Sequence, residues 1–447
     1  MRKRLHHQLP LVQPFIGHEH ARELEVISNI LDSDPGIVDL VYADLVRDVK
    51  QTDTGRCGMS GEQVLRALII KQMNGFSYEE LAFHLADSYS YRTFCRLGIA
   101  ETTLPRSTLQ RNIKRIRAET LETINRRLVR YARGAGIERG RKVRIDCTVT
   151  ETNIHQPSDS SLLWDCVRVL TRLLLWGREM VDIPVTDHRR RAKRRAMGIR
   201  NAKRNKERVG YYRDLLKVTR KTVGMAERMA RALQESESAR SVAPDLAMQL
   251  RLFIQRARRV ISQTERRVLN GQRVPAQEKI VSIFEAHSDI IVKDRRDTLY
   301  GHKLCLATGA SGFVLDCVVE EGNPADSTLA VDMVTRQETL YERVPRQVAF
   351  DGGFTSSANL KDIKGLGVKD VAFAKKRGLK VTEMVKSSWV YKRLRHFRAG
   401  IEGIISLLKR CFGMDRCMWC GLPSFRSYVW SSVVTANLLL MARHVLQ

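Results

Sequence analysis

Residues 141–148, Arg-Lys-Val-Arg-Ile-Asp-Cys-Thr, decide the fold prediction. Upstream of this stretch the apolar residues recur at helical spacing, whereas within it apolar and polar residues alternate. The apolar positions are Val143, Ile145 and Cys147, and the polar ones between them are Arg144, Asp146 and Thr148. A period of two is typical of a β-strand. An acid in such a strand is costly to bury unless it is paired or binds a metal. The stretch therefore predicts a first core strand that carries Asp146 as a candidate functional residue.

Strand patterns resume in the last third of the chain and end at a second acid. Two runs separated by a glycine-containing turn predict a hairpin, and shorter runs alternate with helical stretches. The expected elements are strands over 303–308 and 314–319, a helix that begins at 323–327, and short strands over 347–350 and 371–374. Asp351 closes the third of these strands, just before Gly352 and Gly353, and Glu402 lies in a final helical stretch. This order predicts an α/β core.

The first 135 residues predict a helical domain. Helical periodicity begins at about residue 20, and three short helices follow over about 60–74, 77–85 and 108–116. The third helix is basic and carries Gln110, Arg111, Lys114 and Arg115. This pattern predicts a helix-turn-helix module whose last helix contacts DNA in a major groove. The alternative is a purely structural group of helices, because short helices joined by turns are common in proteins that never bind DNA.

A long helical tract separates the first predicted strand from the others. It runs from Leu162 to about Val268 and contains a dense basic run over residues 189–208. We expect domains at 1–135 (helical), 136–160 (first core strand), 161–290 (basic helical insertion) and 291–447 (remainder of the core). The insertion is expected to bind phosphates. The alternative is a solvated basic face.

The composition favours a polyanionic partner. The 447 residues include 77 Lys plus Arg and 49 Asp plus Glu, for a net charge of +28. Such an excess, spread over most of the chain, is typical of proteins that bind nucleic acid. Nine cysteines without a framework spacing and a basic start without an apolar segment predict a cytoplasmic protein. Residues 433–442, the most apolar stretch, are too short to span a bilayer and predict a core helix.

Three acids on separate elements suit phosphodiester chemistry. Two Mg²⁺ ions roughly 4 Å apart can activate the attacking oxygen and stabilise the leaving oxygen. Because Mg²⁺ keeps several waters, a few carboxylates from rigid elements suffice, and DNA phosphate completes each shell. Asp146, Asp351 and Glu402 are the candidates for catalysis and for metal binding, with Mn²⁺ as a possible substitute ion.

Several motifs also resemble a known family. Arg398, Glu402 and Lys409 match the R, E and K of the YREK signature of insertion-sequence transposases, whereas Arg395 stands at the tyrosine position. Longer stretches resemble the ISNCY group of bacterial DDE transposases. They are 146–148, 153–155, 157–160, 300–303, 321–327, 349–354 and 398–419. The region 60–98 similarly resembles the helical N-terminal domain of such enzymes.

The resemblance implies a ribonuclease-H-like catalytic core with Asp146, Asp351 and Glu402 as the DDE triad. It implies an enzyme that binds terminal inverted repeats of double-stranded DNA, frees 3′ hydroxyl ends and joins them to target DNA. Arg398 and Lys409 would then contact DNA phosphate, with helix-surface salt bridges as the alternative. We further expect a homo-oligomer on DNA, no membrane association, and a location on the bacterial nucleoid.

Two other functions fit parts of the sequence. A DNA-binding repressor would keep the basic helices without needing the acids, and a nuclease that never rejoins DNA would keep the acids without needing to recognise element ends. Two weaker signals are also present. Cys411, Cys417 and Cys420 lack the paired spacing of a zinc site, and Trp164 and Trp176 have the spacing of a packed core rather than of a base-stacking platform.

Overall fold

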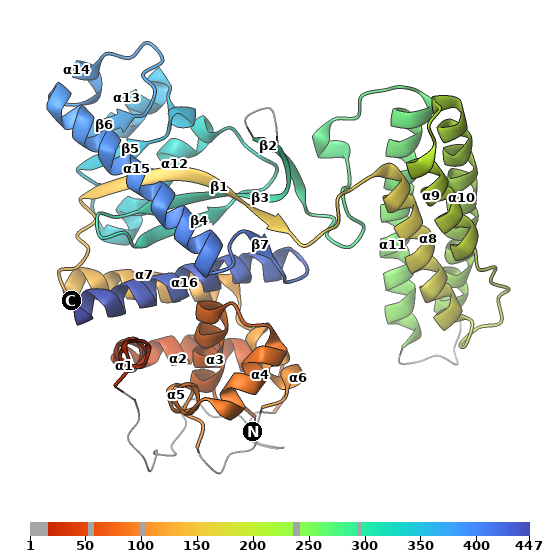
Figure 1. Ribbon diagram of the computed structural model, residues 1–447, viewed down its shortest axis with the longest axis horizontal. Helices are drawn as coiled ribbons and strands as arrows, with labels where there is room; N and C mark the ends of the chain where they lie inside the picture. Colours follow the sequence, from red (N-terminus) through yellow and green to blue (C-terminus); the bar gives the residue numbers. More distant parts are fainter. Residues whose placement is uncertain (1–16, 52–57, 99–103, 236–241, 294–296) are drawn as a thin grey trace. The chain divides into compact units, whose positions relative to one another are not determined.

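The computed structural model describes residues 17–51, 58–98, 104–235, 242–293 and 297–447 (Figure 1). The chain forms two compact units, one of residues 1–151 with 302–447 and the other of residues 152–301. The N-terminal helices, which we expected as a domain of their own, share the first unit with the sheet. The reason is a continuous hydrophobic core that runs from these helices into the strands. The basic N-terminal start, 1–13, lies outside the described residues.

A mixed sheet has most of its residues in the first unit, whereas its residues 152, 289–293 and 297–301 belong to the second. Its order is β2-β3-β1-β5-β6, with β4 on β3 and β7 on β1. The strands are β1 (Lys142–Thr152), β2 (Asp289–Lys293), β3 (Asp297–Thr308), β4 (Val314–Val319), β5 (Gln347–Phe350), β6 (Asp370–Phe373) and β7 (Arg416–Cys417). The predicted hairpin is confirmed as β3 and β4, which pair antiparallel from Leu304↔Val319 to Thr308↔Val314. The short strands β2 and β7 were not predicted, because neither has an alternating run of useful length.

Helices accompany the parallel part of the sheet. Strand β1 pairs parallel with β5, and β5 pairs parallel with β6, so each pair needs a crossover connection. The elements are α12 (Asp326–Tyr341), η3 (Gly352–Phe354), α13 (Ser357–Gly365), α14 (Val381–Met384) and α15 (Ser388–Cys411). In Figure 1, α15 runs across the sheet as one long blue helix, and it packs on β5 and β6. It is the element that brings Glu402 to the sheet.

Within the described residues, seven helices precede the sheet in the sequence. They are α1 (Glu19–Asp32), α2 (Pro35–Val46), α3 (Gly61–Asn74), α4 (Tyr78–Asp87), α5 (Tyr89–Phe94), α6 (Arg106–Ile113) and α7 (Ala118–Gly134). Helix α3 is capped at its C-terminus by Gly75, whose backbone is left-handed with φ of 66°. Ser77 and Glu80 form a capping box at the start of α4. The short helix α5, between the second and third predicted helices, was missed.

The C-terminal helix α16 (Leu422–Leu446) joins the N-terminal helices to the sheet. It packs on α7, α1, α3 and β4 (Figure 1). In the described part of the chain it is the one helix long and apolar enough to cross a membrane by length and composition, and 72% of that window is buried inside the protein. Residues 433–442 are therefore buried by protein contacts, as expected of a core helix.

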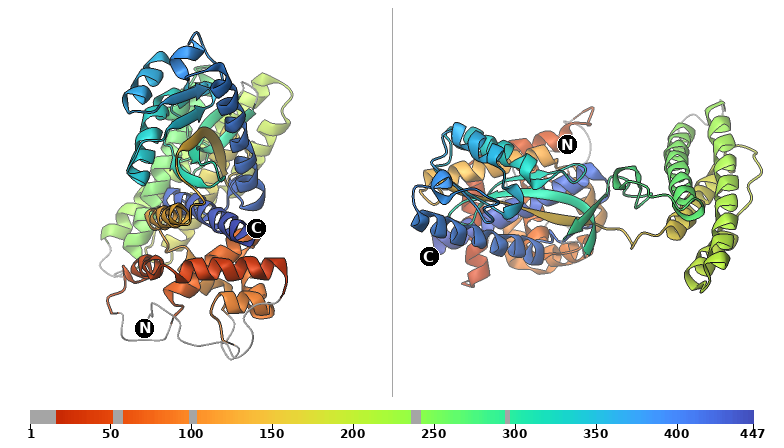
Figure 2. Two further views of the ribbon diagram at one scale, coloured as in Figure 1. Left: turned by 90° about the vertical axis from the view of Figure 1, so that its left-hand side faces the viewer. Right: turned by 90° about the horizontal axis from the view of Figure 1, so that it is seen from above.

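The second unit is a group of packed helices with a core of its own. Its elements are α8 (Asp159–Gly177), α9 (Arg189–Asn201), α10 (Asn205–Glu235), α11 (Ala243–Thr264), the π-helical turn η1 (Glu265–Leu269) and η2 (Ala276–Glu278). Figure 2 shows α8, α10 and α11 side by side, and each packs on the other two. Trp164 contacts this core as predicted, but Trp176 is 41% exposed because it lies near the end of α8 on its outer side.

Candidate active site

Parallel strand pairing brings two of the three candidate acids together. Strand β1 pairs with β5 from Lys142↔Gln347 to Ile145↔Phe350. Asp146 follows Ile145 in β1, and Asp351 follows Phe350 at the end of β5. The register therefore places the two acids side by side at the same level of the sheet. Paired strands lie about 4.8 Å apart, which is close enough for two carboxylates to share one ligand.

Helix α15 adds the third acid and a cation. Arg398 and Glu402 are four residues apart, so they lie on the same side of the helix. The Nη2 atom of Arg398 lies 2.8 Å from Oδ2 of Asp146 and 2.8 Å from Oδ1 of Asp351, and its Nη1 lies 2.9 Å from Oε1 of Glu402. One guanidinium therefore contacts carboxylates from β1, from the end of β5 and from α15.

The three carboxylates differ in burial. The side chain of Asp146 is 12% exposed, that of Asp351 is 39% exposed, and that of Glu402 is 67% exposed. Burial raises the pKa of Asp146 to about 6, and the charge of Asp351 adds to the rise, although Arg398 and the backbone N–H of Cys147 oppose it. A further positive charge near Asp146 would therefore stabilise the ionised form of its carboxylate.

Two glycines after Asp351 allow its loop to pass between neighbouring side chains. A Cβ on Gly352 would lie 2.8 Å from Cγ of Lys375, and a Cβ on Gly353 would collide with the carboxylate of Asp326. Asp326 is fixed in turn by Lys303, whose Nζ lies 2.9 Å from Oδ1 of Asp326. Because these side chains surround the loop, larger residues at either glycine would displace Asp351.

The comparisons with protein families decide what kind of core this is. A family described as transposase domain (DUF772) matches residues 13–115, and a family described as transposase DDE domain matches residues 272–438. Two stretches of the chain thus match transposase domains. No curated protein and no solved structure matches the chain. The ISNCY group named from the sequence stays a prediction.

The match to the DDE domain implies a ribonuclease-H-like core, in agreement with the mixed sheet. The matched residues include Asp351 and Glu402, whereas Asp146 lies outside them. Residues 152–301 stand between β1 and the rest of the core in the sequence, and the match begins within them, at residue 272. The role of Asp146 therefore depends on geometry rather than on the family match.

Divalent metal is the cofactor that this transposase family generally requires. No group of three or more His, Cys, Asp or Glu side chains is close enough to hold an ion within the described residues. The reason at the acidic site is that the guanidinium of Arg398 occupies the space between the carboxylates. The donor set itself fits Mg²⁺, because it consists of carboxylate oxygens on rigid elements that already converge on a cation.

The residues predicted to bind DNA lie in different surroundings. Gln110, Arg111 and Lys114 are exposed on or just after α6, whereas Arg115 donates from Nη1 to the carbonyl oxygen of Leu45 at 3.0 Å. Arg115 therefore links α6 to α2. The other three side chains remain available for DNA.

Two further predicted positions lie on or near α15. Lys409 pairs with Asp415, with 3.5 Å between Nζ and Oδ1, which is the salt-bridge alternative stated for it. Cys417 is buried and its thiol contacts the carbonyl oxygen of Trp419 at 3.6 Å, so it is held by the β7 turn. Arg398 faces the acids themselves rather than open solvent.

A residue that sequence reasoning missed is Arg144. It lies two positions before Asp146 and so points to the same side of β1. Its Nε donates to Oγ1 of Thr308 at 2.8 Å, and its Nη1 donates to the carbonyl oxygen of Phe397 at 2.9 Å. Arg144 therefore holds α15 against β1. The only sequence signal for this contact is that Arg144 lies on the same face of the strand as Asp146, because basic residues are common in this chain.

Proposed function

We propose that this protein is a DNA transposase that binds terminal inverted repeats, cuts DNA at the ends of a mobile element and transfers the 3′ hydroxyl ends to target DNA. The observation that carries the proposal is the convergence of Asp146, Asp351 and Glu402, from three separate elements, on one cation. The two transposase domain matches support DNA as the substrate.

In this proposal the three carboxylates hold two Mg²⁺ ions, with Mn²⁺ as a substitute. Bound there, the ions would activate the attacking oxygen and stabilise the leaving oxygen of an in-line displacement. Asp146 and Asp351, side by side at the strand ends, would form the inner ligands. Glu402, the most exposed of the three, would approach from α15.

Arg398 has a second partner available in this mechanism. Its guanidinium matches both carboxylate and phosphate geometry. When DNA and metal enter, a phosphate oxygen can replace the carboxylates as its ligand, and α15 keeps it beside the scissile bond. The buried Nε of Arg398 has no hydrogen-bond partner among the described residues, so one donor of the guanidinium is ready for an added acceptor.

The cellular setting is proposed on the same basis. A net charge of +28 suits a protein that works on nucleoid DNA in a bacterial cytoplasm. Pairing two element ends requires at least two binding sites, so we propose that the protein acts as a homo-oligomer on DNA. Gln110, Arg111 and Lys114 are the residues proposed to contact the repeats.

The test is Mg²⁺-dependent cleavage and strand transfer on DNA that carries the ends flanking the gene. Asp351→Asn should abolish both reactions and retain DNA binding, because the amide keeps the shape of the side chain but loses its charge. The matched control is Asp362→Asn on α13, an exposed acid away from the site. It should leave both reactions unchanged.

Each rival function predicts a different pattern. A repressor would bind the ends without cutting them in either form. A nuclease that never rejoins DNA would cut without strand transfer and would show no preference for the ends. If Asp351→Asn cuts and joins as well as the wild type, the proposed triad is wrong.

A further inference from the structure

The second unit holds much of the positive charge of the chain. Residues 152–301 contain 32 of the 77 lysines and arginines but 17 of the 49 acids, which is a net charge of +15 out of +28. The predicted basic run over 189–208 explains only part of this excess. The run holds 11 of the 32 cations, and α10, the longest helix of the described residues with 31 residues, carries eight, two of which belong to the run.

Seven cations of α10 share one side of the helix and are all exposed. We call this set the cationic stripe: Lys206, Arg213, Lys217, Arg220, Lys221, Arg228 and Arg231. At 3.6 residues per turn these positions fall within an arc of about 100°, and the stripe is about 38 Å long at 1.5 Å per residue. A regular one-sided row of this kind does not follow from high charge alone.

Acidic residues flank the stripe instead of neutralising it. On one edge, Asp214 pairs with Arg191 and Arg195 of α9. On the other edge, Glu227 pairs with Arg258 of α11 at 2.7 Å. These two acids are thus engaged by cations from the neighbouring helices. Of the other two acids of α10, Glu207 accepts from the hydroxyl of Tyr211, and Glu235 lies on the side of the stripe, four residues beyond Arg231.

Most of the stripe has no partner among the described residues. Arg220 pairs with Glu265, but the other six side chains make no hydrogen bond or ion pair within the part of the chain that the structure describes. Six exposed cations in a row repel one another, and a fixed anionic surface would relieve this repulsion.

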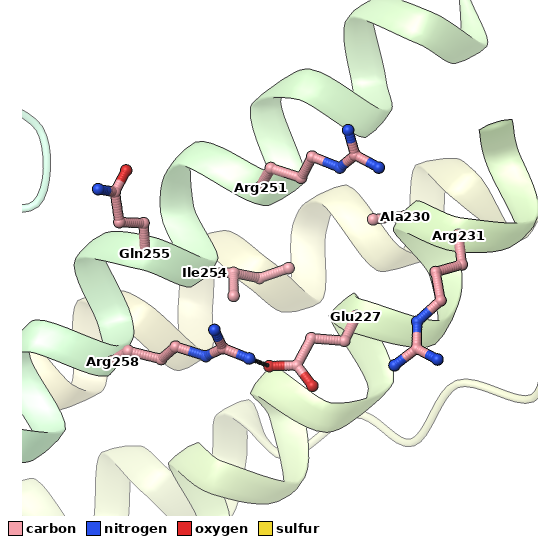
Figure 3. Close-up of a pocket in the computed structure, with 7 residues that line it drawn as sticks. All are labelled: Glu227, Ala230, Arg231, Arg251, Ile254, Gln255 and Arg258. Carbon is pink, nitrogen blue, oxygen red and sulfur yellow. Dashed lines mark hydrogen bonds and ion pairs between the residues drawn. The ribbon is translucent and has the colours of Figure 1, made fainter.

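The groove beside the stripe continues this surface onto α11. Figure 3 shows a hollow of about 440 Å³ between α10 and α11, lined by Glu227, Ala230, Arg231, Arg251, Ile254, Gln255 and Arg258. In this view Glu227 reaches Arg258, whereas Arg231 points away from both. A second hollow of about 360 Å³ adjoins it and shares Glu227 and Arg258. The cations of α11 therefore extend the basic surface along one edge.

We propose that the cationic stripe is a second DNA-binding surface, which lies along the phosphate backbone of a duplex and contacts it without reading its sequence. The proposal rests on the proposed function in taking DNA as the partner. A length of about 38 Å corresponds to roughly eleven base pairs at 3.4 Å each, which is one turn of the duplex. The side chains are lysines and arginines without aromatic residues among them, which suits backbone contact rather than base stacking.

The experiment measures how duplex affinity depends on salt. The full chain would bind a 30-base-pair duplex of arbitrary sequence in EDTA, so that no cleavage step enters. The test variant carries Lys217→Gln, Lys221→Gln and Arg228→Gln. The matched control carries Arg172→Gln, Arg178→Gln and Arg273→Gln, which removes the same charge from exposed positions of the same unit away from the stripe.

We expect the stripe variant to flatten the slope of log K against log salt by about 2 to 3, because each lost phosphate contact removes about 0.9. The control should change it by less than half of that. A charge-preserving variant with Lys217→Arg, Lys221→Arg and Arg228→Lys should keep the wild-type slope, and unfolding curves should coincide for all four proteins.

Two results would overturn the proposal. If both triple variants flatten the slope equally, the effect belongs to net charge rather than to the stripe. If the stripe variant keeps the wild-type slope, the stripe does not contact DNA and is only a solvent-exposed surface. Because the measurement contains no metal, a failure to cut DNA would count against the proposed function and not against this surface.

Discussion

Arg144 of β1 donates from Nη1 to the carbonyl oxygen of Phe397 in α15 at 2.9 Å, and its guanidinium stacks 4.8 Å from the centre of the Phe397 ring. The same Nη1 occupies the place that a Cβ on Gly400 would take. Gly400 therefore lets an arginine of the strand lie against the helix. Since Asp146 follows on the same face of β1, this contact fixes how α15 presents Arg398 and Glu402 to the acids.

Gly400→Ala should reduce DNA cleavage by at least about tenfold, which corresponds to about 1.4 kcal/mol in the barrier. The added methyl would force Arg144 off the helix and shift α15 relative to β1. The rate of single-turnover cleavage on pre-bound DNA measures the effect, and the binding constant for DNA should change much less.

Gly403→Ala is the matched control on the same helix. A Cβ at Gly403 would meet nothing within 4 Å. Replacing an exposed helical glycine by alanine stabilises a helix by about 0.5 to 1 kcal/mol. Gly403→Ala should therefore raise the unfolding midpoint and keep activity. Equal loss of cleavage in both variants would show that glycine is needed for flexibility of α15 rather than for the Arg144 contact.

The parts of this fold that could be predicted are those whose sequence signals are local. Periodicity and caps are local, and they correctly predicted β1, β5, the hairpin and the start of α4 at Ser77. The pairing of Asp146 with Asp351 depends on register between strands about 200 residues apart, and only family resemblance could place the two acids in one site.

Other features of the site had no local signal at all. Arg144 resembles many basic residues of this chain, and Gly400 lies in an otherwise regular helix. The contact of Arg398 with all three acids could not be predicted from the sequence either, because it depends on α15 crossing the strand ends. The shared core of the N-terminal helices and the sheet was missed because burial between distant segments leaves no periodic pattern of its own.

Arg398→Gln should strengthen metal binding by the protein without DNA. Removing a cation that lies within 3 Å of three carboxylates makes the cluster more negative. Binding of Mn²⁺, measured by electron paramagnetic resonance, should tighten by about tenfold. This corresponds to about 1.4 kcal/mol of repulsion removed between the guanidinium and the metal ion, a modest amount for charges this close.

The control for this variant is Arg395→Gln on the same helix, where the guanidinium lies over the Tyr391 ring at 5.9 Å. Its Mn²⁺ affinity should match that of the wild type. Both variants lose one positive charge, so a similar gain in the two would indicate a general electrostatic effect. Weaker Mn²⁺ binding by Arg398→Gln would mean that Arg398 holds the acids in place for the metal.

Asn437→Leu should lower the free energy of unfolding by about 2 to 4 kcal/mol, because it leaves several buried polar groups without partners. The Asn437 side chain accepts from the backbone N–H of Val314 at 2.9 Å and donates to the carbonyl oxygen of Val314 at 2.8 Å and to Oδ1 of Asn125 at 2.7 Å. It thus joins α16 to β4 and α7. Urea unfolding followed by circular dichroism gives the value.

Thr435→Val on the same helix should not lower the free energy of unfolding. The Oγ1 atom of Thr435 is buried and has no hydrogen-bond partner among the described residues. An isosteric methyl removes an unsatisfied hydroxyl, so stability should stay the same or rise. Comparable losses in the two variants would show that packing of α16, and not the polar network at Asn437, dominates the effect.

Lys71→Met should stabilise the protein at neutral pH and remove part of its pH dependence. Lys71 is 8% exposed in α3, with its Nζ 5.0 Å from the centre of the Tyr78 ring. Burial lowers the pKa of Lys71 to about 8, because the charged form is poorly solvated there. The unfolded chain, with an ordinary lysine pKa of 10.5, binds more protons between these two values. Stability should therefore rise as pH increases from about 8 to 10.5, by up to about 3 kcal/mol.

Methionine has a similar length without the charge, so the variant should show little of this rise and should already be more stable at pH 7. Urea unfolding at pH 7, 8, 9 and 10 measures both effects, and Lys361→Met on the exposed side of α13 is the control that should keep the wild-type profile. If Lys71→Met instead lowers stability at pH 7, the contact of the ammonium group with Tyr78 outweighs the cost of burying its charge.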